Sequence, residues 1–503
     1  MVTRHFVVVL LAAALAAGCG HVLVCARQGG PAWRQYDSHH FAVTTDLSPP
    51  RARRLVAELE RTYRIFVDAT GWRFPGRGEP PGRMRVVVFS RRADYDAVGP
   101  AHSDGFYRPE TLDAESAVVI DNDGSHAPGE VFMHELTHRL VRYYVPNLPL
   151  GLNEGLAEYF STFDIRSDVV ALGLPPRRFA YLNDTMLPSV DTLFSAESLD
   201  GLSPAQKDAF YRGGWFLVHT MAKYYPQELG GMLGRLADGE SIREAFTDAF
   251  GGTAWAMLGS RYVSVVSAAY QPGGFSVPTW RKPYQPPAQV EGVTDEHDLG
   301  DGALHLLWAD LQRGRRDIAP QVTLAAAHGG DSAELAYMRA LVDLDRKDVG
   351  AAERDLRAAV DGRPDEERYH LTLARVRMLG LGADSKQALA AMAPEMEWLD
   401  AHAQLPDARA IVGLYYAMRG DFATARAQGQ RVLGVDPTNA NGYLVLAIVA
   451  EETGDLDGAI SDAERALRPT PEGASHKPAQ LLLATLYARR RGPLRLNPPK
   501  LLR

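Results

Sequence analysis

Two histidines, His134 and His138, lie four residues apart in the stretch HELTH, and Glu135 directly follows the first of them. If this stretch is helical, the two imidazoles lie one turn apart on the same face, because an α-helix has 3.6 residues per turn. Both could then bind one zinc ion, and Glu135 could take a proton from a water molecule held by the metal. The alternative is an exposed helix face with two solvated histidines and a surface glutamate.

A catalytic zinc site of this kind needs a third protein ligand and an open fourth position. Glu154 follows in the stretch LPLGLNEGLAEYF, where two prolines and a glycine predict a turn between two helices. A second helix folded back on the first would bring Glu154, near its start, opposite the histidines. Glu158 lies one turn further along the same face.

HELTH followed by LNEGLAEYF resembles the gluzincin metallopeptidases, which include thermolysin and the M1 aminopeptidases, and is most similar to the peptidase MA-like (DUF1570) proteins. The resemblance implies a zincin-like α+β domain over residues 31–270, with Zn²⁺ as the cofactor. It also implies that Glu154 is the third zinc ligand and that Glu158 supports His134 through a hydrogen bond.

A tyrosine is a further candidate for the chemistry. The M1 enzymes have a tyrosine in a Y-x-x-G context that stabilises developing negative charge, and Tyr211 with Gly214 has this spacing. A tyrosine that only packs two helices together explains the pattern equally well, and His219 is another candidate donor on the same stretch. The G-x-M-E-N segment with which M1 enzymes bind a free amino terminus is absent from the sequence. This favours endopeptidase over aminopeptidase action.

The elements that must position these residues are strands and helices upstream and downstream of HELTH. HFAVTT, RMRVVVFS and SAVVID have the composition of strands, and PPRARRLVAELERTYRIFVDATG has apolar residues at helical spacing. Together they predict an N-terminal mixed sheet with a helix. From HELTH to about residue 270 the pattern is mainly helical.

The remainder of the chain predicts a second kind of structure. Residues 271–301 are rich in proline and glycine and are interpreted as a linker. Residues 302–495 are rich in alanine and contain landmarks that recur after 34 residues, which resembles the tetratricopeptide repeat (TPR). These landmarks are Gly420-Asp421 and Gly454-Asp455, Ala425 and Ala459, and Pro437 and Pro471. The sequence therefore predicts an all-α solenoid, and the repeats imply a protein partner.

The first residues suggest where the protein resides. Residues 1–18 have a short basic start and an apolar run like a bacterial signal peptide, and LAAGC at Cys19 resembles a lipobox. An uncleaved anchor or a signal cut elsewhere are the alternatives. With Cys19 lipidated, the protein would be held at the membrane of the bacterial cell envelope, facing the periplasm or the exterior. The formal net charge of −8 argues against nucleic acid as a partner.

These patterns predict a zinc-dependent peptidase that acts on peptide or protein substrates at the cell envelope. The rival hypothesis is a catalytically retired gluzincin domain that serves with the repeats as a protein-binding scaffold. The presence of Glu135 favours the enzyme, because a site kept for structure alone needs its ligands but not the base.

Overall fold

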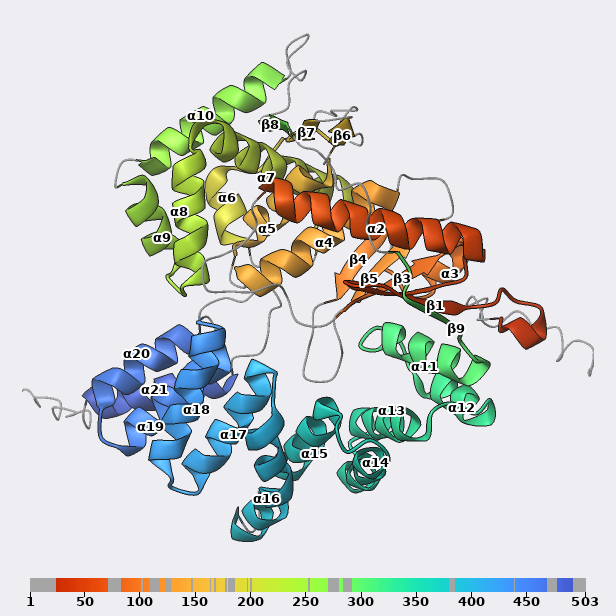
Figure 1. Cartoon of the computed structure of the whole chain (residues 1–503). Coiled ribbons are helices and arrows are strands. Elements are labelled where there is room, and N and C mark those ends of the chain that lie inside the picture. Colours follow the sequence, from red (N-terminus) through yellow and green to blue (C-terminus); the bar gives the residue numbers. More distant parts are fainter. Residues whose placement is uncertain are drawn as a thin grey trace, which may run out of the picture.

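The computed structural model describes a sheet-containing part, a helical part and an array of helical hairpins (Figure 1). Among the described residues, no helix is both long enough and apolar enough to span a lipid bilayer. The expected signal peptide and Cys19 lie outside the described residues, so the lipid anchor stays a prediction. The structure describes residues 24–70, 83–100, 103–108, 117–122, 128–145, 148–162, 164–166, 169–176, 179, 186–196, 198–199, 201–251, 254–269, 280–283, 292–379, 385–437, 439–467 and 477–491.

A six-stranded mixed sheet forms the N-terminal part, as the sequence predicts. Strands β2, β3 and β5 are parallel to one another, whereas β1, β4 and β9 are antiparallel to their neighbours. The strand order is β4-β5-β3-β2-β1-β9, so β4 and β9 are the edge strands. The strands are β1 (Arg34–Asp37), β2 (Phe41–Thr45), β3 (Met84–Phe89), β4 (Gly105–Arg108), β5 (Ala117–Asp121) and β9 (Asp295–Asp298).

Helices cover both faces of this sheet (Figure 1). Alternate residues of a strand point to opposite faces, and Val86 and Val88 pack with α2 (Pro49–Thr70) and α4 (Pro128–Tyr144) on one side. Val87 faces the other side, where it packs with α11 (Asp301–Gln312). This double cover explains why β3 and β5 contain runs of four apolar residues, Val86–Phe89 and Ala117–Ile120, instead of alternating sequences.

The helical part follows α4 in the sequence and confirms the prediction of a mainly helical segment. It also contains a small antiparallel sheet with the strand order β6-β7-β8, which the sequence did not predict. Its helices are α5 (Leu150–Ser161), α6 (Val190–Ser195), α7 (Pro204–Tyr224), α8 (Pro226–Ala237), α9 (Ile242–Phe250) and α10 (Ala254–Ala269), and its strands are β6 (Asp164–Arg166), β7 (Val169–Leu172) and β8 (Trp280–Pro283). Short helices η1 (Ala26–Gln28) and α3 (Arg92–Asp96) belong to the sheet part.

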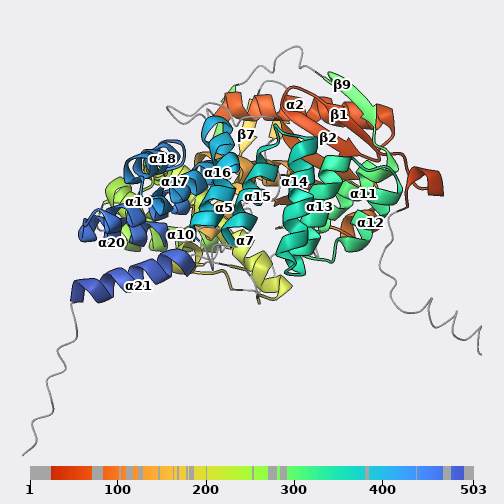
Figure 2. The same cartoon turned by 90° about the horizontal axis from the view of Figure 1, so that it is seen from below.

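The C-terminal part is an array of helical hairpins that curves below the other two parts (Figures 1 and 2). Its helices are α11 and α12 (Ala319–Ala327), α13 (Ser332–Asp345), α14 (Val349–Gly362), α15 (Glu367–Leu379), α16 (Ser385–His402), α17 (Pro406–Met418), α18 (Phe422–Val435), α19 (Ala440–Glu452), α20 (Leu456–Ala466) and α21 (Lys477–Arg491).

The 34-residue period corresponds to a repeated hairpin geometry. Gly420 and Gly454 have φ angles of 79° and 87°, which favour glycine, and each ends the first helix of a hairpin. The aspartate that follows each glycine caps the next helix with its side chain, as Asp421 does through the Thr424 amide. Two equivalent alanines, Ala425 and Ala459, are fully buried where the helices cross. The predicted repeats are therefore confirmed as structural repeats; Pro471 lies outside the described residues.

The structure differs from the predicted boundary between the first domain and the repeats. The segment predicted as a linker contains β8, which pairs with β7, and β9, which pairs with β1. Helix α11, predicted as the start of the solenoid, buries Leu304, Trp308 and Leu311 against the sheet. The array also contacts the helical part further along the chain, where Gly239, after α8, lies against Pro437, after α18. The contact is so close that a Cβ on Gly239 would lie 2.6 Å from the Pro437 carbonyl oxygen. The first repeat helix is thus part of the core of the sheet.

Substitution of Trp308 tests whether the stability of the sheet part depends on its packing with α11. The Trp308 ring is fully buried and meets the rings of Trp33 and Phe89 edge-on, with centroids 5.8 and 5.4 Å away. We expect Trp308→Ala to lower the free energy of unfolding by about 3–5 kcal/mol, because it leaves a cavity between helix and sheet. Urea denaturation followed by circular dichroism measures this change. The control Met418→Ala, at an exposed array position, should stay within about 0.5 kcal/mol of wild type; equal values for both variants would contradict a shared core.

Candidate metal centre

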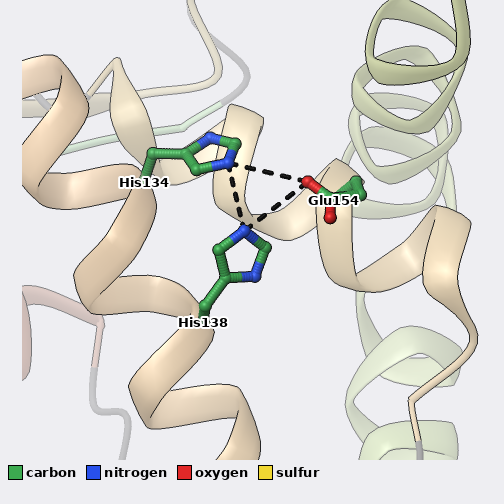
Figure 3. Close-up of side chains that lie close together, drawn as sticks. All are labelled: His134, His138 and Glu154. Carbon is green, nitrogen blue, oxygen red and sulfur yellow. Dashed lines mark hydrogen bonds and ion pairs between the residues drawn. The ribbon is translucent and has the colours of Figure 1, made fainter. Parts of the chain in front are cut away.

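Two helices bring the candidate ligands together. His134 and His138 lie on α4, and Glu154 lies in the first turns of α5, which packs against α4 (Figure 3). Helix α4 is amphipathic, and its apolar residues Phe132, Leu136 and Leu140 are buried in the core of the sheet part. The histidine face is left on the side towards α5.

The three side chains have the geometry of a metal site. The two histidine Nε2 atoms are 3.1 Å apart, and Glu154 Oε2 lies 3.6 Å from His134 Nε2 and 3.5 Å from His138 Nε2. Ligand atoms in a tetrahedral zinc site are roughly 3.3 Å apart, given bonds of about 2.0–2.1 Å. In the part of the chain that the structure describes, this is the one group of three His, Cys, Asp or Glu side chains with such spacing. The residues therefore fit a zinc ion.

The outer nitrogen of each imidazole also has a partner. His138 Nδ1 lies 3.1 Å from Asn153 Oδ1, and His134 Nδ1 lies 3.3 Å from Glu158 Oε1. Both neighbouring atoms are oxygens, so a hydrogen on Nδ1 of each imidazole would face an acceptor, and Nε2 would be left to bind a metal ion. Glu158 thus lies beside His134, and its predicted supporting role stays a prediction. The contact of Asn153 with His138 was not predicted, although Asn153 directly precedes the predicted ligand Glu154 in the sequence.

The two histidines and the carboxylate of Glu154 influence the pKa values of one another. Burial alone would lower the pKa of His138, but the negative charge and hydrogen bond of Glu154 raise the pKa to about 9. Burial alone would raise the pKa of Glu154, but the two histidines hold it well below its usual range. The carboxylate of Glu154 therefore favours a positive charge beside it, which a proton on His138 or a metal ion that replaces this proton can supply.

Glu135 lies on α4 between the histidines and the edge strand β4. Its side chain is buried, with 7% of the residue surface exposed. A Cβ on Gly105, the first residue of β4, would lie 2.4 Å from Val131 Cγ1 and 3.6 Å from Glu135 Cγ. Glycine at position 105 thus permits β4 to approach α4 closely. The structure places Glu135 beside this strand, and it is not one of the three residues of the cluster.

Glycines also fix the position of α5. A Cβ on Gly155 would lie 2.4 Å from the Gly214 carbonyl oxygen, so α5 and α7 are in direct backbone contact next to Glu154. Tyr211 lies one turn before Gly214 on α7 and is half-buried; its proposed role in stabilising charge stays a prediction. His219 is buried against the Trp215 ring, 4.6 Å away between centroids, and burial lowers its pKa to about 4. His219 is therefore a buried residue, and its role as a donor stays a prediction.

Among known proteins, this chain is similar only to solved structures at the level of the comparisons made. The chain matches no protein-family model, and no curated protein matches it. A thermophilic TPR protein of Thermus thermophilus is 18% identical, with a TM-score of 0.31, over 37% of this chain and 98% of that chain. A tetratricopeptide repeat protein of Parabacteroides merdae is 16% identical, with a TM-score of 0.28, over 54% of this chain and 99% of that chain.

A third similar structure is PilW, described as a widely conserved type IV pilus biogenesis factor. It is 16% identical to this chain, with a TM-score of 0.29, over 38% of this chain and 92% of that chain. Two of these three proteins are described as tetratricopeptide repeat proteins, which is the class predicted for the C-terminal part. TM-scores of this size support no statement about function.

Proposed function

We propose that this chain is a zinc-dependent peptidase of the gluzincin type that cleaves peptide bonds within a chain. The observation that carries the proposal is the cluster of His134, His138 and Glu154, in which three ligand atoms lie 3.1–3.6 Å apart. The outer nitrogens of both histidines are held by Asn153 and Glu158. The motifs HELTH and LNEGLAEYF, which resemble those of gluzincins, support the same assignment.

The residues around the cluster have separate roles in this proposal. A bound zinc ion would supply a Lewis acid for the scissile carbonyl and lower the pKa of a water molecule. Glu135 accepts the proton of the attacking water and delivers it to the leaving amine. Tyr211, on the helix that packs against α5, is proposed to donate a hydrogen bond to the oxygen on which negative charge develops.

The edge strand β4 is proposed to bind the substrate. β4 pairs with β5 and is the last strand in the order of the sheet. An extended peptide can add to such an edge as a further strand. The close approach of Gly105 to Glu135 would bring a peptide on β4 near the base. This arrangement favours an extended segment of a peptide or protein as the substrate.

Two further parts of the proposal concern location and partners. Lipidation at Cys19 would hold the protein at the bacterial cell envelope, and the motif LAAGC supports this. The array of hairpins is proposed to bind a protein partner, because stacked helical repeats present an extended surface for binding. We propose no nucleic-acid partner, because the net charge of the chain is −8.

Metal removal tests the enzymatic proposal. The purified protein is incubated with a peptide library before and after treatment with the chelator 1,10-phenanthroline, and cleavage is followed by mass spectrometry. We expect cleavage that stops on chelation and returns when zinc is added, because the ligands need the metal to activate water. Cleavage that continues without metal would contradict the proposal. A zinc-loaded protein that cleaves no peptide would favour the scaffold hypothesis.

A further inference from the structure

The edge strand β4 lies between α4 and α11, and its side chains alternate between them. Tyr107 packs with the cluster that contains α4, and Gly105 abuts Val131 on that helix. Phe106 and Arg108 point to the opposite face, where they meet α11 and the residues directly after it. The distance of β4 from α4, and so from Glu135, is therefore set partly from the side of α11.

Asp310 makes the main polar contact of α11 with this strand. Its Oδ2 atom accepts hydrogen bonds from Arg108 Nη2 at 2.7 Å and from Arg85 Nη1 at 3.3 Å. Its carbonyl oxygen accepts a second bond from Arg108, through Nη1 at 2.7 Å. The guanidinium of Arg108 thus contacts Asp310 at two points, which fixes its direction as well as its distance.

This contact is buried and charged. Asp310 is 4% exposed. Burial alone would raise its pKa, but the charges of Arg108 and Arg85 lower the pKa to about 2, so the carboxylate is ionised at neutral pH. A buried ion pair of this kind is costly to break, because the remaining charge has no water to replace its partner.

Residues that follow Asp310 strengthen the same attachment. The guanidinium of Arg315 lies over the Phe106 ring, 4.6 Å from its centroid, and donates to the Val98 carbonyl oxygen at 2.8 Å. Gln312 donates to the Ala97 carbonyl oxygen at 3.2 Å. The end of α11 is therefore bonded to β4 and to the segment that precedes it in the chain.

We propose that Asp310, on the first helix of the repeat array, is a positioning residue that holds β4 at the distance from Glu135 required to bind an extended substrate. The repeat array then has two roles, because α11 fixes the position of β4 in addition to any binding of a partner by the other repeats. The part of this inference that concerns substrate rests on the proposed function. The coupling of Asp310 to β4 does not.

Hydrogen exchange and kinetics on the full chain test this inference together. Asp310→Asn keeps the shape of the side chain but removes the charge that binds Arg108. Arg108→Lys keeps the charge of the strand residue but removes the two-point contact, and it serves if Asp310→Asn does not fold. The matched control is Glu334→Gln, which breaks a half-buried pair with Arg368 (2.7 Å) inside the array.

We expect the amides of residues 105–108 to exchange about ten-fold faster in Asp310→Asn and Arg108→Lys than in wild type, because the strand loses its anchor. In Glu334→Gln their exchange should not change. The kinetic test uses a series of peptides that are lengthened residue by residue on either side of the cleaved bond. For the long peptides of this series, we expect KM to be about ten-fold higher in Asp310→Asn and Arg108→Lys than in wild type. The kcat/KM for the shortest cleaved peptide should stay at the wild-type value.

Unchanged exchange of residues 105–108 in both variants, or an equal change in Glu334→Gln, would overturn the inference. So would a loss of kcat that is the same for peptides of every length, because it would indicate a general loss of structure. A wild-type protein that cleaves no peptide would contradict the proposed function, and the exchange measurement alone would then decide whether Asp310 holds β4.

Discussion

Glu154→Ala is expected to purify largely without zinc. The carboxylate supplies one of the three ligand atoms, with Oε2 at 3.5 and 3.6 Å from the two histidine nitrogens. The two imidazoles that remain give an incomplete ligand set, whereas zinc sites in enzymes have three protein ligands. Zinc per chain, measured by inductively coupled plasma mass spectrometry after dialysis, gives the result directly.

Glu158→Ala is the matched control for this prediction, because it removes a carboxylate one turn further along the same helix. Glu158 contacts His134 Nδ1 at 3.3 Å and belongs to no ligand position of the cluster. Its loss should leave zinc bound, with affinity weakened roughly ten- to a hundred-fold. If Glu158→Ala were the metal-free variant and Glu154→Ala kept its zinc, the two assignments would have to be exchanged.

Glu135→Gln is expected to keep its zinc and to lose about two to four orders of magnitude in kcat, because no other group is proposed to accept the proton of the water. Glutamine has nearly the same size as glutamate, so the packing of α4 beside Gly105 and Val131 should survive. The measurement is the rate of peptide cleavage at saturating substrate, with zinc content as the control. Cleavage at the wild-type rate by the zinc-loaded variant would show that Glu135 is not the base.

The sequence predicts the residues of the candidate centre because they lie on two helices that are near each other in the chain. The spacing of His134 and His138 follows from helical geometry, and the turn before Glu154 brings α5 back onto α4. Glu158, one turn further along α5, lies 3.3 Å from His134 Nδ1. Two strands of the sheet are also recognised from local sequence, since β3 and β5 each contain a short apolar run.

The parts that could not be predicted depend on contacts between distant segments. Strand β9 has the sequence DEHD, which has no apolar alternation, because it forms the edge of the sheet through backbone hydrogen bonds with β1. Helix α11 has the composition of a repeat helix, and only the fold shows that its apolar face covers the sheet. The bonds of Asp310 to Arg108 join residues 202 positions apart, a separation at which sequence spacing carries no information.

The central claim is that His134, His138 and Glu154 bind one zinc ion. Anomalous diffraction from crystals of the zinc-loaded protein, recorded on both sides of the zinc absorption edge, tests it most directly. We predict a single strong peak about 2 Å from both histidine Nε2 atoms and from a Glu154 carboxylate oxygen. A fully loaded protein whose zinc peak lies away from these three residues, or no peak in crystals grown with zinc, would contradict the account.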